Sequence, residues 1–75
     1  MDIMRVDVRA LPVWERPAKI SEVFEKLPLG ASITFVTENE PRGLAFRMEQ
    51  KWPHEIIVDH RRTGDHEWTV RLTRA

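Results

Sequence analysis

The stretch EIIVDHRRTGDHEWTVRLT, residues 55–73, contains two runs of alternating apolar and polar residues around the sequence Thr-Gly-Asp. Alternation with a period of two is typical of a strand with one buried face, and a short polar segment with glycine between two such runs predicts a β-hairpin. A three-residue loop at residues 63–65, with Gly64 at positive φ, keeps the apolar residues of both strands on one face. Those apolar residues are Ile56, Val58, Trp68, Val70 and Leu72.

The register of this hairpin has two consequences for the sheet. His60 lies opposite Trp68, which predicts a cross-strand pair of the two rings. Ile57 points to the opposite face, away from the apolar side of the hairpin.

Residues 41–51, just upstream of the hairpin, fit two patterns. The alternation within residues 44–48 is compatible with a strand, whereas the spacing of four apolar residues fits one face of a helix. We favour a helix because Pro41 is a start signal, because the last turn is rich in good helix formers, and because Pro53 stops it. The residues on the helical face are Leu44, Ala45, Met48 and Trp52.

The N-terminal half predicts a strand, a helix and a second strand. The first strand ends near Ala10, Pro17 suits the first position of the helix, and Gly30 follows its end. β-branched residues at positions 32–36 indicate the second strand. The apolar faces of the three elements are Met4, Val6 and Val8, then Ile20, Val23, Phe24 and Leu27, then Ile33 and Phe35.

The order strand, helix, strand, helix, strand, strand predicts an α/β (α+β) two-layer sandwich. In this fold a four-stranded mixed sheet carries two helices on one face. A length of 75 residues favours a single domain, residues 1–75. The other face of the sheet is expected to meet water, which leaves Val36 and Ile57 partly uncovered as a modest contact patch. The polar residues that suit this exposure are Thr34, Thr69, Arg71 and Thr73.

The composition excludes several classes of function. The chain has no cysteine, so disulfides and thiolate chemistry are excluded. Twelve basic and twelve acidic residues interleave without a basic stripe, which argues against a nucleic-acid partner. The apolar runs are too short for a signal peptide or a membrane helix, so we expect a cytoplasmic chain with no membrane partner.

Four short blocks, in this order, resemble a family of uncharacterised bacterial domains related to the TusA/SirA sulfur carriers. They are VDVRALP, FEKLPLG, ENEPRGL and the closing G-x-x-x-W-x-V-R-L, and the resemblance spans residues 6–74. It implies a single TusA/SirA-like domain with sheet order 1-2-4-3 and an antiparallel last strand.

The resemblance does not extend to the chemistry of the carriers. They place a Cys-Pro-x-Pro motif after strand one, where this chain has ALPVWERP, so it implies no persulfide transfer. The uncharacterised relatives often have Arg-His before the first helix and His-Asp-Pro-Arg before the second. Here the two places read Arg16-Pro17 and Asn39-Glu40-Pro41-Arg42, so the histidines that would build a metal or haem site are missing.

Three arginines form the candidate ligand site. With strands one and two parallel, as the resemblance implies, the N-termini of both helices open at one edge of the sheet, where Arg9, Arg16 and Arg42 approach. Free N–H groups and guanidinium groups together make an anion site. The alternative, and the commoner arrangement, is that nearby acidic residues pair with the arginines and leave a neutral rim. These acidic residues are Glu15, Glu38 and Glu40.

Tryptophans and histidines supply the other candidates. Trp14 and Trp52 lie outside clear apolar faces, so they are either partner anchors or lids over the small core, which we favour. The three histidines lie on separate parts of the hairpin, and a metal site needs three or four converging ligands. They are His54, His60 and His66.

These patterns predict a non-catalytic small binding domain for a small anion or a protein partner at the helix N-termini, with no cofactor or metal. No serine has a histidine at readable spacing, and there is no glycine-rich phosphate loop, so we do not expect an enzyme. The alternative is an accessory module that docks a redox or sulfur-handling protein through the open sheet face. Trp14, Trp52 and Ile57 are the candidate partner contacts, and the oligomeric state is left open.

Overall fold

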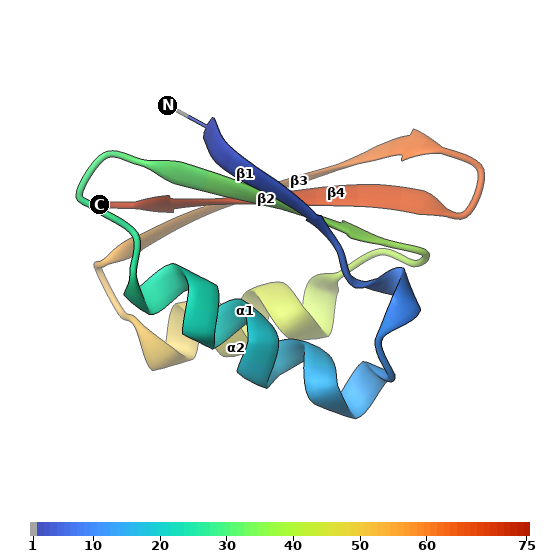
Figure 1. The fold of residues 1–75 in the computed structure, drawn as a ribbon, viewed down its shortest axis with the longest axis horizontal. Coiled ribbons are helices and arrows are strands. Elements are labelled where there is room, and N and C mark those ends of the chain that lie inside the picture. Colours follow the sequence, from blue (N-terminus) through green and yellow to red (C-terminus); the bar gives the residue numbers. More distant parts are fainter. Residues whose placement is uncertain (1) are drawn as a thin grey trace.

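A computed structural model describes residues 2–75 and confirms the predicted two-layer fold, with both helices on one face of a four-stranded sheet (Figure 1). The strand order is β1-β2-β4-β3, with β1 parallel to β2 and β4 antiparallel to both of its neighbours. The strands are β1 (Asp2–Asp7), β2 (Ser32–Thr37), β3 (Ile56–Gly64) and β4 (Glu67–Arg74). The helices are α1 (Arg16–Glu25) and α2 (Arg42–Lys51), and two 3-10 turns, η1 (Val8–Ala10) and η2 (Val13–Glu15), precede α1.

The core lies between the two helices and the sheet. The predicted apolar faces of α1 and β2 are buried there, since Ile20, Phe24 and Phe35 are fully covered. Residues 42–51 form a helix rather than a strand, and Met48 on its apolar face is 1% exposed. Trp52 closes the core at the end of this helix, with its ring 4.6 Å from that of Phe24. No helix among residues 2–75 is long and apolar enough to cross a membrane.

The first strand ends earlier than predicted, at Asp7 instead of Ala10. The backbone N–H of Arg9 donates to Asp7 Oδ1 at 3.0 Å, and this side-chain cap starts η1. A cap of this kind offers the backbone an alternative to the strand ladder, so the chain turns there. Val8 nevertheless stays in the core, because the turn keeps it fully buried.

The hairpin keeps the predicted faces but not the predicted register. His60 lies opposite Val70, and Trp68 lies opposite Arg62. The strands run on to the Gly64–Glu67 pair, with a register shift after Arg62. The turn is therefore shorter than residues 63–65, and His66 rather than Gly64 takes the positive φ, at 54°. His60 and Trp68 still contact each other diagonally, with ring centroids 6.1 Å apart.

The open face of the sheet is less apolar than predicted. Val36 is 1% exposed, whereas Ile57 is 58% exposed. Arg9 lies within 2.7 Å of Asp7 on β1 and 3.7 Å of Glu67 on β4, so its side chain crosses β2, which lies between these strands. This bridge covers the end of β2, and the expected contact patch loses Val36.

The end of β4 fastens the end of α1. Arg74 Nη1 donates to the carbonyl oxygens of Phe24, Glu25 and Leu27 at 3.2–3.4 Å. These carbonyls lie at the C-terminus of the helix, where backbone acceptors have no partner within the helix. Gly30, at φ 80°, turns the chain back and donates its N–H to the carbonyl of Arg74 at 2.7 Å.

We expect Arg74→Gln to lower the free energy of unfolding by about 1–2 kcal/mol, because a charged donor is removed from three backbone acceptors. Arg71→Gln is the matched control. It lies on the same strand, makes no ion pair or hydrogen bond with a described side chain, and should change stability by less than about 0.5 kcal/mol. Urea denaturation of both variants measures the difference. Equal stability of the two variants would contradict the helix-fastening role.

Candidate functional site

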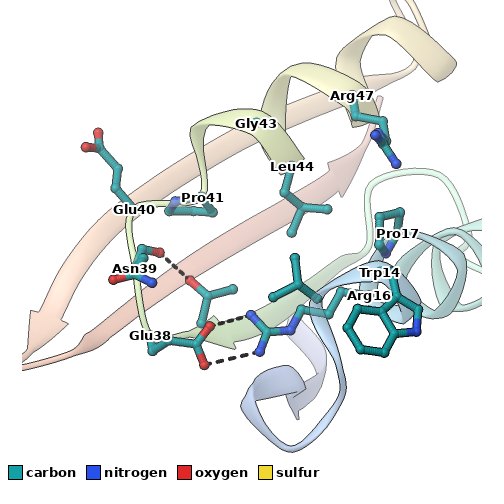
Figure 2. A pocket seen from close by; sticks show the side chains of 12 residues that line it. Trp14, Arg16, Pro17, Glu38, Asn39, Glu40, Pro41, Gly43, Leu44 and Arg47 are labelled. Carbon is teal, nitrogen blue, oxygen red and sulfur yellow. Dashed lines mark hydrogen bonds and ion pairs between the residues drawn. The ribbon is translucent and has the colours of Figure 1, made fainter.

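A pocket of about 490 Å³ opens where η2 and the start of α1 face the start of α2 (Figure 2). The C-terminal end of β2 forms its base, so the helix N-termini meet at one edge of the sheet, as predicted. The volume lies within the range of small-molecule sites, about 300–1,000 Å³. Its apolar lining consists of Val13, Trp14, Pro17, Pro41 and Leu44. Its charged lining consists of Arg16, Glu38, Glu40 and Arg47.

An ion pair between buried Arg16 and half-buried Glu38 holds one wall of the pocket. Arg16, only 9% exposed, donates from Nε to the carbonyl of Leu11 at 3.0 Å and from Nη2 to Glu38 Oε2 at 3.1 Å. Its Nη1 donates to Glu38 Oε1, so the contact is bidentate. The hydrogen bonds from Arg16 lower the pKa of Glu38 below its ordinary value, against the opposing effect of desolvation. The pair fixes the start of α1 to the end of β2 and cancels the charge of Arg16.

The start of α2 has no side-chain cap. Pro41 occupies the capping position and makes no such hydrogen bond, while Thr37 Oγ1 donates to the carbonyl of Asn39 at 2.8 Å. The first intrahelical bond runs from the Ala45 N–H to the Pro41 carbonyl at 2.8 Å. The N–H groups before Ala45 therefore lack a side-chain acceptor, and Gly43 and Leu44 place this positive helix end in the pocket.

Arg47 and Trp14 also line the pocket. Arg47 lies one turn after Gly43 on α2 and points toward Pro17 of α1 (Figure 2). It makes no ion pair with a described side chain. Trp14 is 81% exposed on η2, and Val13 beside it is 67% exposed. Arg47 was not predicted as a site residue, although its place four residues after Gly43, on the same helical face, was the available signal.

The three predicted arginines do not share this pocket. Arg16 lines it, whereas Arg9 and Arg42 lie outside its lining. Arg42 is 80% exposed in its side chain, and its Nε donates to Glu40 Oε1 at 2.7 Å. Arg16 and Arg42 are therefore paired with Glu38 and Glu40, which is the alternative arrangement with a neutral rim. Arg9 pairs with Asp7 and approaches Glu67.

The other predicted residues are dispersed. Trp52 is a lid over the core, as favoured, but Trp14 is not. Ile57 is exposed on the opposite face of the sheet from both helices. Among the described residues, no three side chains of the metal-binding types converge, and the three histidines lie apart.

Comparison with known proteins gives one family match. Residues 5–74 match a family described as "Uncharacterized conserved protein (DUF2249)". No curated protein and no solved structure matches the chain.

We expect Glu38→Gln to lower the free energy of unfolding by about 1–3 kcal/mol at pH 7, because it leaves the buried guanidinium of Arg16 without its counter-charge. Glu40→Gln, whose partner Arg42 is exposed, is the matched control and should cost less than about 0.5 kcal/mol.

The effect should depend on pH. The folded protein lowers the pKa of Glu38 below the ordinary 4.5, so its stabilising contribution is complete above pH 4.5 and is lost as the pH falls through the folded value. Denaturation at several pH values should show the wild type and Glu38→Gln converging in acid. A difference that stays constant down to pH 3 would contradict the ionic origin of the effect.

Proposed function

Because the chain belongs to the DUF2249 family of uncharacterized conserved proteins, we propose its function from its own pocket: a non-catalytic domain that binds a carboxylate carried on an apolar body. The carboxylate lies between Arg47 and the N–H groups of Gly43 and Leu44. The apolar body lies against Trp14 and Val13.

The observation that carries this proposal is which charged residues of the pocket lining have an ion-pair partner. Arg16 and Glu38 neutralise each other, and Glu40 is held by Arg42. Arg47 is then the one lining charge without a partner among the described side chains, and it lines the same pocket as Gly43 and Leu44 of the uncapped first turn of α2. Both groups attract an anion to the same place.

The rest of the lining selects the kind of anion. A guanidinium group matches the two oxygens of a carboxylate. With Glu38 and Glu40 paired, the single charge of Arg47 balances a singly charged anion and leaves a multiply charged one only partly compensated. The exposed indole of Trp14 offers a large apolar contact at small entropic cost, as in protein and small-molecule sites.

A binding role fits the chemistry of the charged groups better than catalysis does. A general acid or base works best with a pKa near the operating pH. The pKa of Glu38 is lowered instead, and both of its oxygens are engaged by Arg16. Its role in the proposal is to hold the wall of the pocket.

We also infer a distant relationship to the TusA/SirA sulfur carriers. The element order and the sheet order β1-β2-β4-β3 support it. The segment that follows strand one, where the carriers hold their thiolate, here forms η1, η2 and the Trp14 wall. In this proposal the segment after strand one, which holds a reactive sulfur in the carriers, lines a binding pocket in this chain.

The experiment is a titration of ¹⁵N-labelled protein with phenylacetate, with 2-phenylethanol as the neutral analogue. Phenylacetate should shift the amides of Gly43 and Leu44 and the indole N–H of Trp14, and the alcohol should not. A second pair of probes, acetyl-Leu-Glu-Leu-amide and its Gln analogue, tests whether an acidic protein segment binds better than a free acid. The tighter probe identifies the source of the carboxylate.

Arg47→Gln should weaken binding by about tenfold, the loss of one charge-assisted contact. Arg42→Gln removes the same charge from the same helix outside the pocket and should leave affinity within about twofold. Equal weakening by both variants would place the ligand at the arginine cluster predicted from the sequence. The absence of shifts with phenylacetate and with the Glu peptide would overturn the proposal.

A further inference from the structure

The open face of the sheet carries a row of polar residues that spans all four strands. Arg5 on β1 lies opposite Thr34 on β2, Thr34 lies opposite Arg71 on β4, and Arg71 lies opposite Asp59 on β3. Because neighbouring strands are about 4.8 Å apart, the Cα atoms of Arg5 and Arg71 are separated by about 9.6 Å. Two arginine side chains can converge over that distance.

The row lies in a hollow. A shallow cavity of about 310 Å³ has Arg5, Arg61 and Arg71 on its sides. Thr34, 9% exposed, forms the base, and Asp59 is the one acidic residue among the described residues of the lining. Three arginines against one aspartate make this hollow strongly positive in a chain whose formal net charge is zero.

The described acidic side chains around the hollow each have a partner, which for Asp59 is Arg61 of the same hollow. Asp59 lies 3.7 Å from Arg61, and Asp7 lies 2.7 Å from Arg9, which lowers its pKa to about 2. Glu67 accepts a hydrogen bond from Thr63 Oγ1 at 2.8 Å. Arg5 and Arg71 therefore remain without an ion pair to any described side chain.

We propose that this hollow binds a diphosphate group, which Arg5 and Arg71 hold from opposite sides. The excess of about two positive charges matches an anion with at least two negative charges, and each guanidinium fork can engage two phosphate oxygens. The Thr69 hydroxyl, which also lines the hollow, supplies a neutral donor. This site is independent of the carboxylate pocket, which lies on the other side of the sheet.

The lining distinguishes this ligand from other anions. A carboxylate offers two oxygens and one charge, and it leaves one guanidinium unused. A single-stranded nucleic acid is held largely by stacking on aromatic side chains, and the hollow contains none. The phosphate chemistry is shared by free pyrophosphate and by a nucleoside diphosphate, so the test includes both.

The test is a titration of ¹⁵N-labelled protein with sodium pyrophosphate, ADP and acetate. Pyrophosphate should give saturable shifts at residues 5, 34, 69 and 71 and leave Gly43 unmoved, and acetate should give no saturable shift. Binding should weaken as salt is added. Equal affinity for ADP and pyrophosphate assigns recognition to the diphosphate alone, and tighter ADP binding assigns it to a nucleoside diphosphate. Both results support the site.

Arg5→Gln and Arg71→Gln should each weaken pyrophosphate binding by at least about fivefold. Arg62→Gln is the matched control because it removes the same charge from β3 outside the hollow, where Arg62 pairs with Asp65 at 3.3 Å. A comparable loss in Arg62→Gln would show that pyrophosphate responds only to net charge and would overturn the proposal. Non-saturable shifts in the wild type would overturn it as well.

Discussion

The bidentate contact between Arg16 and Glu38 is the interaction on which the shape of the pocket depends. It joins the first residue of α1 to the residue that follows β2, two points 22 positions apart in the chain. The buried guanidinium of Arg16 also donates a hydrogen bond to the carbonyl of Leu11, and this bond helps to fix its orientation. Because a buried charge without its partner is costly, the segment between β1 and α1 is confined to one path. That path places Trp14 at the edge of the pocket.

The distribution of ion pairs, rather than net charge, decides where this chain can attract anions. Its charges cancel overall, yet the pairs between Asp7 and Arg9, Glu38 and Arg16, and Glu40 and Arg42 each occupy an acidic group near the sheet. Apart from Arg74, which binds the end of α1, the arginines without an ion pair to a described side chain lie in two places. One lies beside an uncapped helix among apolar residues, and two lie on a polar sheet face. The two environments favour different anions because their neighbouring atoms differ, although the cation is the same.

Local patterns predicted the elements and their buried faces, because periodicity reports burial directly. The helix at residues 42–51 needed the signals of Pro41 and Pro53 as well as spacing, whereas the shared face of the hairpin follows from spacing alone. The register of the hairpin does not, since side-chain alternation fixes only parity and shifts by two residues keep every face. His60 therefore lies opposite Val70 without any change in which side chains are buried. Val36 was mispredicted for another reason: it is 1% exposed at the end of β2, where Arg9 pairs with Asp7 on one neighbouring strand and approaches Glu67 on the other, 58 residues further along the chain. The candidate site was predictable in position, from the helix starts, but the partner of Arg16, the one predicted arginine that lines the pocket, is set by a contact 22 positions along the chain.

The exposure of Trp14 is the feature that the fold itself does not require. A domain of this size has little core, and burying a large apolar side chain stabilises it by about 1.5–3 kcal/mol. Trp52 contributes to the core in this way, because its indole packs against the ring of Phe24. Trp14 is 81% exposed instead, on η2, and it lines the same pocket as Arg47. An apolar surface kept exposed by a rigid and well-paired wall is what a binding site needs. The same surface would be a disadvantage for a domain that had only to fold.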